Sequence, residues 1–196
     1  PFYFYVVKLA QFLQPNPNPA GGDTFTAIRI AQDRVCELPH TGVASAIDIG
    51  NPTDIHPKNK QDVGQRLARW ALRDVYGQKD TVVSGPTLKG LAIAGNKAVI
   101  SFNHLGGGLM KASKQGLAVP VETPDAELRG FAISGADKKW HWAKAQIVGE
   151  SVEVSAAEVA QPVAVRYAYA SNPGKVNLYN KAGLPAIPFA SDVWMP

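Results

Sequence analysis

The first 77 residues contain apolar runs of two kinds. Residues 2–10 combine aromatic and β-branched side chains with little alternation, which is typical of a strand buried on both faces in a parallel sheet. Residues 24–38 have helical spacing, residues 41–50 form a second short apolar run, and residues 51–77 contain a second helical pattern. The order strand, helix, strand, helix predicts a three-layer α/β domain.

Both predicted helices have one apolar face. In the first, Asp23 or Thr24 is the expected N-cap, and Arg29 and Asp33 are expected to pair on the outer face, four residues apart. In the second, Gly77 is the expected stop. The residues predicted to face inward are Phe25, Ile28, Ala31 and Val35 in the first helix, and Val63, Leu67, Trp70 and Ala71 in the second.

After Gly77 the pattern becomes that of an antiparallel β protein. Short apolar runs alternate with polar residues and are separated by Gly, Asn, Pro and Asp. We therefore predict two domains, an α/β part over residues 1–78 and an antiparallel β-sandwich over residues 79–196. Trp140 and Trp142 share one face of a predicted strand and are expected in the sandwich core.

Composition and charge narrow the function classes. The 196 residues are 45% hydrophobic, enough for a sizeable core, and the net charge of +4 is spread without a basic stripe, so nucleic acid is not expected as a partner. No run reaches the roughly 18 apolar residues of a membrane span, so no membrane partner is expected either. The chain opens without a methionine or a signal peptide, and we expect that the gene product begins upstream.

Metal and cofactor chemistry has little support in the sequence. Cys36 is expected to be a buried thiol, and one cysteine gives no disulfide and no metal-ligand spacing. His40, His104 and His141 are too dispersed for a zinc site. The glycines of residues 104–109 lack the Lys and Ser/Thr of a phosphate-binding loop, so a flexible turn is expected there. No metal and no cofactor are predicted.

The segment NPTDIHPKNK, residues 51–60, carries the candidate chemistry. Pro57 suits a first helical turn, which places His56 at or just before a helix cap, at the carboxyl edge of the predicted sheet, where ligands collect in α/β folds. A neutral imidazole can act as a general base, and a carboxylate on its other nitrogen fixes the tautomer and stabilises the imidazolium. Asp54 is the nearest candidate for that carboxylate and Asp48 the second.

A family resemblance gives these residues a context. The segment LPHTGVASAIDIGNPTDIHPKNKQDVGQRLARWAL, together with PFYFYVVKLAQF before it and PVAVRYAYASNPGKVNLYNKAGLPAIPF after it, resembles the C-terminal part of the sialate O-acetylesterases, which are SGNH-type carbohydrate esterases. The resemblance covers essentially the whole chain. It implies a Ser-His-Asp esterase that removes acetyl groups from sugars, with His56 as the base and Asp54 as its orienting acid. SGNH enzymes more broadly space this pair as D-x-x-H, whereas here it is D-x-H, so Asp48 stays open as the alternative acid.

The resemblance also implies a nucleophile that this chain does not show. No serine here stands in a G-D-S or G-x-S-x-G elbow, and Ser45 falls inside a predicted strand. We therefore predict the C-terminal part of an SGNH-like domain followed by a sandwich. Its expected partner is an N-terminal half of the same enzyme that supplies the serine, either in a longer gene product or as a cleaved subunit. The chain alone is predicted to be inactive.

Other aspects of function stay open at this stage. The substrate is an O-acetylated sugar, and sialic acid and acetylated xylan or pectin all fit. The resemblance implies a secreted, periplasmic or lysosomal protein. The alternative function is a glycan-binding or structural β-sandwich module that carries a vestigial esterase segment.

Overall fold

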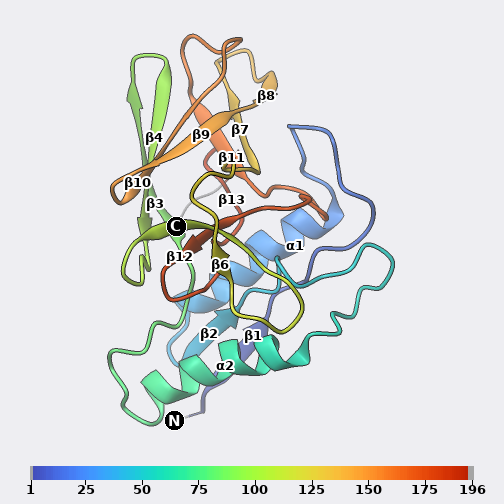
Figure 1. Ribbon diagram of the computed structural model, residues 1–196, viewed down its shortest axis with the longest axis vertical. Coiled ribbons are helices and arrows are strands. Elements are labelled where there is room, and N and C mark those ends of the chain that lie inside the picture. The colour runs from blue at the N-terminus through green and yellow to red at the C-terminus, as the bar shows by residue number, and fades with distance from the viewer. Residues whose placement is uncertain (1, 194–196) are drawn as a thin grey trace.

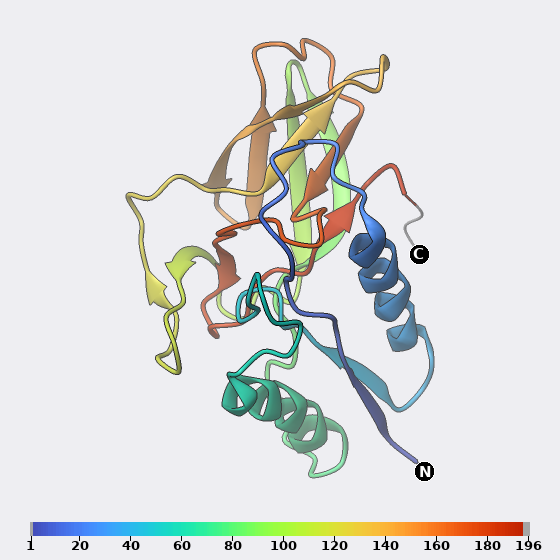
Figure 2. The ribbon, with the colours of Figure 1, turned by 90° about the vertical axis from the view of Figure 1, so that its right-hand side faces the viewer.

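The N-terminal region places a helix on either side of a short parallel sheet. The computed structural model describes residues 2–193. The elements of this region are β1 (Phe4–Val7), α1 (Thr24–Asp33), the 3₁₀ helix η1 (Arg34–Glu37), β2 (Thr41–Ala44) and α2 (Lys60–Asp74). β1 and β2 pair in parallel with Phe4 opposite Thr41, and the pair lies between α1 and α2 in Figures 1 and 2.

Close packing of Trp70 on β2 fixes α2 against this sheet. The indole Nε1 donates to the carbonyl of Val43 at 2.9 Å, and a Cβ added at Gly42 would lie only 2.3 Å from the ring. Glycine at position 42 therefore allows the close approach of strand and helix. The inward line predicted for α2 is present, because Trp70 is buried and Val63 and Leu67 are partly covered.

The predicted inner face of α1 is wrong. Its buried residues are Thr26 and Arg29, whereas Ile28 is 42% exposed. The carboxylate of Asp33, which was expected to pair with Arg29, accepts instead from Lys8 Nζ at 2.5 Å. Burial of an arginine is tolerated when its donors are satisfied. The Arg29 guanidinium donates to four backbone carbonyls, those of Leu9, Ala10, Ala170 and Ser171.

Cys36 also differs from the expectation of a buried thiol. It lies in η1 and is exposed. The apolar spacing that suggested burial continued the helix through residue 38, but the α-helix ends at Asp33 and the tighter 3₁₀ turn rotates the following side chains.

The rest of the described chain is β structure arranged in three antiparallel sheets. The first sheet has the order β3-β4-β10-β9, the second β13-β11-β7-β8 and the third β12-β5-β6. The strands are β3 (Thr87–Ala94), β4 (Lys97–Asn103), β5 (Leu109–Ser113), β6 (Val121–Glu122), β7 (Phe131–Ser134), β8 (Trp140–Trp142), β9 (Lys144–Val148), β10 (Ser151–Ser155), β11 (Ala164–Tyr167), β12 (Leu178–Asn180) and β13 (Phe189–Ala190).

The main hydrophobic core is shared by the two four-stranded sheets. Ile100 on β4 and Val152 on β10 belong to one sheet, Ile133 on β7 and Tyr167 on β11 belong to the other, and all four are in one buried cluster. Tight turns join neighbouring strands, and Gly95 adopts the left-handed backbone (φ 63°) between β3 and β4. Alternation of inward and outward residues along β4 and β10 explains why these strands could be predicted from sequence.

The two tryptophans of β8 lie outside this core. Trp142 is 50% exposed, and its Nε1 donates to the Pro17 carbonyl at 3.2 Å. Trp140 is covered by the Arg166 guanidinium, which lies 3.9 Å from the ring centroid. The expectation of core tryptophans is therefore wrong, because the N-terminal loop and a cationic side chain cover them in place of apolar residues.

At the level of class, the prediction is confirmed. The chain is a mixed α/β structure that is mostly antiparallel sheet with few helices. Contacts cross the predicted boundary at residues 78 and 79, for example from Arg29 to the carbonyl of Ala170 at 2.6 Å. The division into two domains stays a prediction.

Candidate active site

The loop between β2 and α2 brings Asp54 and His56 together. Asp54 Oδ1 accepts a hydrogen bond from the His56 backbone N–H at 2.9 Å and lies 3.1 Å from Nδ1 of the same imidazole. A carboxylate that bonds the N–H two residues onward is the ordinary Asx turn, so the local sequence alone is enough to form this pair. The same oxygen thus holds both the backbone and the ring of His56.

Electrostatics assign the tautomer of His56. The backbone N–H of His56 and then its ring lower the pKa of Asp54, which keeps this carboxyl ionised near neutral pH. A carboxylate only accepts hydrogen bonds, so Nδ1 is assigned as the protonated nitrogen, and Nε2 is left as the acceptor. The imidazole is 83% exposed, so Nε2 is open to a reacting group.

The relation of His56 to the helix differs from the prediction. α2 begins at Lys60 with Asn59 as its N-cap, so His56 lies three residues before the cap and Pro57 lies outside the helix. The field of a helix terminus acts mainly within its first turn. Control of the imidazole therefore rests on Asp54 rather than on the helix.

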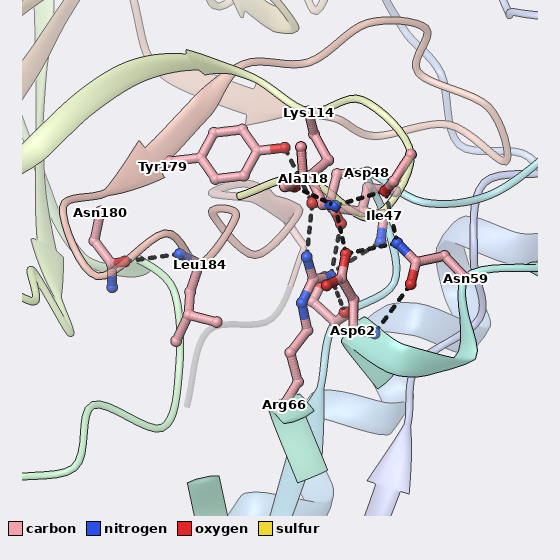
Figure 3. A network of polar contacts seen from close by, with 12 residues as sticks. Ile47, Asp48, Asn59, Asp62, Arg66, Lys114, Ala118, Tyr179, Asn180 and Leu184 are labelled. Atoms are coloured by element: carbon pink, nitrogen blue, oxygen red, sulfur yellow. Dashed lines mark hydrogen bonds and ion pairs between the residues drawn. The ribbon is translucent and has the colours of Figure 1, made fainter. Parts of the chain in front are cut away.

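Asp48 is held in a different environment. Its two carboxylate oxygens accept from Arg66 at 2.7 and 2.8 Å, and its Oδ2 also accepts from the Tyr179 hydroxyl at 3.0 Å (Figure 3). Only 2% of the Asp48 side chain and 6% of the Arg66 side chain are exposed. Asp54 therefore lies beside His56, whereas Asp48 forms a buried ion pair with Arg66.

Burial and charge both act on this ion pair. Burial alone would lower the pKa of Arg66, but the hydrogen bonds and charge of Asp48 outweigh it, and the pKa is raised. Burial, and then the charge of Asp48, raise the pKa of Tyr179 well above its usual range, so its phenol stays protonated and donates. Arg66 additionally donates to the Ser45 carbonyl at 2.6 Å.

A second polar cluster holds the other end of the loop. Asn59 Oδ1 accepts from the Asp62 N–H at 3.0 Å, and Asn59 Nδ2 donates to the Asp62 carboxylate at 2.6 Å. Lys114, from the segment after β5, lies 2.6 Å from the same carboxylate. Asn59 also donates to the Gly116 carbonyl at 3.0 Å, so the N-cap of α2 is tied to the third sheet.

These partner residues were not predicted. Arg66 had a signal in the sequence, since it is a charged residue on the inward face of an otherwise apolar helical line. Tyr179 and Lys114 had none, because they lie far along the chain and reach the loop only through the fold.

The serine that precedes the candidate loop, Ser45, is buried. Ser45 lies directly after β2, is 7% exposed, and its Oγ accepts from the Ile47 N–H at 3.4 Å. Among residues 2–193, no group of three or more His, Cys, Asp or Glu side chains is placed to hold a metal ion. Within the same range, no helix is long and apolar enough to cross a membrane.

A cavity of about 400 Å³ lies away from the dyad. It is bordered by η1, Trp70 and β13, and its lining includes Cys36 and His104 but no residue of the loop 49–58. Asp33 and Glu37 also lie in its walls, but neither carboxylate is seen to bond the His104 imidazole among the residues that the structure describes. We place the candidate site by the chemistry of the Asp54–His56 pair rather than by this concavity.

Comparisons with known proteins agree with the resemblance seen in the sequence. No family model matches the chain. The sialate O-acetylesterase of Mus musculus is 25% identical over 211 residues, which cover 98% of this chain and 36% of that protein. The crystal structure of a carbohydrate acetylesterase from Xanthomonas citri has a TM-score of 0.82 and 42% identity, covering 98% of this chain and 41% of that chain.

The match therefore includes the candidate loop and the sheets together, although the chain spans well under half the length of both relatives. An identity of 42% across nearly the whole chain goes beyond a likeness of fold alone. The chain is related to the carbohydrate acetylesterases, and its predicted resemblance to sialate O-acetylesterase is confirmed.

Proposed function

We propose that this chain is part of a carbohydrate O-acetylesterase, to which it contributes His56 as general base and Asp54 as the acid that orients it. The observation that carries the proposal is the 3.1 Å contact between His56 Nδ1 and Asp54 Oδ1, with the ring open to solvent. The names of the two relatives support the reaction class, hydrolysis of an acetyl ester on a sugar.

In the proposed mechanism a serine from outside these 196 residues is the nucleophile. His56 Nε2 accepts the serine proton as the hydroxyl oxygen attacks the acetyl carbonyl, and the Asp54 carboxylate stabilises the imidazolium that forms. The imidazolium then returns this proton to the departing sugar oxygen, which leaves an acetyl-serine. Water attacks that ester with His56 again as base, and acetate and the free serine result.

The architecture proposed with this function is that of an SGNH-type three-layer α/β domain extended by a β-sandwich. The parallel β1–β2 pair between α1 and α2 supports the first part, and the core shared by two antiparallel sheets supports the second. The division at residues 78 and 79 and the N-terminal partner that carries the serine belong to the same proposal.

The glycan-binding alternative has less support. Stacking on a sugar needs a free aromatic face, but the Arg166 guanidinium lies over the Trp140 ring. The Trp142 ring is half exposed, and its indole N–H is bonded to the N-terminal loop. These contacts favour a structural role for Trp140.

The test compares this chain alone with the complete protein that contains the serine segment. With a chromogenic acetyl ester, we expect no turnover by the chain alone above its His56→Ala control. In the complete protein, His56→Ala and Asp54→Asn are each expected to lower kcat by about 10²- to 10⁴-fold, because each removes proton transfer or its orientation. An Asp137→Asn variant is the control for loss of an exposed carboxylate elsewhere.

Two results would count against the proposal. His56-dependent turnover by the chain alone would place the nucleophile within these 196 residues. Full activity of the His56→Ala complete protein would remove the assigned base.

A further inference from the structure

The loop that carries the candidate dyad packs closely on Gln11 at Gly50, near its start, but its side chains make few hydrogen bonds with the rest of the molecule. Within residues 49–58, the side-chain hydrogen bonds described are local, from Thr53 to Asn51 and from His56 to Asp54. Such turns shape the loop but do not fix its position. The position of His56 therefore depends on how the two ends of the loop are held.

Both ends are held by residues of the third sheet, β12-β5-β6, and of the segment that follows β5. At the first end, the Tyr179 hydroxyl on β12 donates to Asp48, which is also clamped by Arg66. At the second end, Lys114 pairs with Asp62, and the Gly116 carbonyl accepts from Asn59. Figure 3 shows the two sets of contacts side by side, between Tyr179 and Lys114 on one side and the first turns of α2 on the other.

The two anchors form one connected unit. Asp62 and Arg66 are four residues apart and so lie on one side of α2, a turn from each other. Tyr179 pairs with Met110 across β12 and β5, and Lys114 directly follows β5. Contacts between α2 and the neighbouring strands β12 and β5 therefore hold both ends of the loop.

The charged groups that hold the second loop end are buried, which limits the arrangements they can adopt. The side chains of Lys114 and Asp62 are 5% and 13% exposed, and Lys114 also donates to the carbonyls of Gly116 and Ala118 at 2.7 Å each. A buried charge that loses its partner is costly, so these groups have one favourable arrangement rather than many.

We propose that Tyr179 and Lys114 are positioning residues that orient His56 through the two ends of its loop. This inference rests on the proposed esterase function for its catalytic consequence, whereas the ordering of the loop is independent of it. Neither residue touches the dyad. Because a displacement of about 1 Å at a reacting group can cost on the order of 10²-fold in rate, loss of either anchor is expected to act on kcat.

The test uses Tyr179→Phe, which removes the hydrogen bond to Asp48, and Lys114→Met, which removes the ion pair with Asp62 and two hydrogen bonds to carbonyls. Both substitutions keep most of the side-chain volume. Tyr76→Phe is the matched control for an exposed tyrosine, and Lys97→Met is the control for a lysine paired on the first sheet, with Glu153. In the complete protein, each anchor variant is expected to lower kcat for a small acetyl ester by about 10- to 100-fold, with KM within about threefold of the unmodified protein. A merely structural role would lower the amount of active enzyme without slowing the active fraction, so active-site titration accompanies the assay.

Amide hydrogen exchange in the 196-residue chain supplies a readout that needs no activity. The backbone amides at the two loop ends are the reporters: that of Ile49, bonded to the Ala46 carbonyl, is expected to exchange at least about tenfold faster in Tyr179→Phe than in the controls, and that of Asp62, bonded to Asn59, at least about tenfold faster in Lys114→Met. Amides of β4 and β10 should stay protected in both variants.

Each outcome decides a different point. Unchanged exchange at the corresponding loop end in both anchor variants overturns the inference, as does faster exchange with kcat unaltered. If the complete protein has no esterase activity, the proposed function fails, and the exchange result alone then shows whether the third sheet orders the loop.

Discussion

Two aspartates near His56 are chemically alike, but they should respond very differently to the same substitution. Asp48→Asn keeps the shape of the side chain and removes its charge, which leaves the guanidinium of Arg66 buried without a counter-ion. Asp54→Asn makes the same change on a carboxylate that is 43% exposed, against 2% for Asp48. The comparison separates a carboxylate that maintains the fold from one that serves the dyad.

The expected magnitude follows from the burial of the Asp48–Arg66 pair. Removal of one partner from a buried ion pair costs about 3 to 5 kcal/mol, because the remaining charge is uncompensated. The total free energy of unfolding of a domain is about 5 to 15 kcal/mol, so the loss is a large share. For a chain of this size it corresponds to a fall in Tm of roughly 6 to 20 °C. Asp54→Asn is expected to leave Tm unchanged.

Urea denaturation at pH 7 measures the difference directly. Tryptophan fluorescence and far-ultraviolet circular dichroism should report the same midpoint if unfolding is two-state, and the m value should be similar in all three proteins. A loss below about 1 kcal/mol for Asp48→Asn, or equal losses for the two variants, would refute the conclusion that Asp48 is held as a buried counter-ion.

Three further changes test other contacts. Gly50→Ala is expected to destabilise the chain, because a Cβ there would lie 2.1 Å from the Gln11 carbonyl oxygen. Gly64→Ala, in open space within α2, should stabilise it by about 0.5 to 1 kcal/mol. Chemical denaturation measures both changes in the free energy of unfolding, and changes of the same sign would contradict the packing described. Arg29→Lys should lower the free energy of unfolding by on the order of 3 kcal/mol, since an ammonium cannot reach four carbonyls, and a thermal melt close to that of the unmodified chain would count against it. Burial, and then the charge of Asp33, raise the pKa of Cys36, so its thiolate fraction is small. Iodoacetamide should therefore modify this exposed residue at pH 8 more slowly than it modifies free cysteine, and an equal rate would show that the pKa is not raised.

Local features of the chain were predictable, and the reason is physical. The Asp54–His56 contact joins residues two positions apart, so the turn that forms it can be predicted from the local sequence. Hairpin turns such as the one at Gly95 depend on a few neighbouring residues, and α2 has a regular apolar line. These elements need no information from distant parts of the chain.

Features that depend on distant partners were not predictable. The inward face of α1 was misassigned because Arg29 is satisfied by carbonyls 141 and 142 residues away. The start of α2 was placed too early because the N-cap Asn59 owes part of its stability to Gly116, 57 residues onward. A single sequence shows residue types and spacing, and it does not show which backbone groups will surround a side chain.

The contact between Asp48 and Tyr179 has a consequence for how the protein is made. The two residues are 131 positions apart. At a synthesis rate of about 5 to 20 residues per second, Tyr179 follows Asp48 out of the ribosome by roughly 7 to 26 s. Asp48 can meet Arg66 early, and Lys114 can meet Asp62 some time later, but the contact that Tyr179 makes at the first end of the loop forms last. The dyad sequence is thus synthesised long before all of its supports, and a chain that ends before Tyr179 would carry His56 and Asp54 on a loop held at only one end by the third sheet.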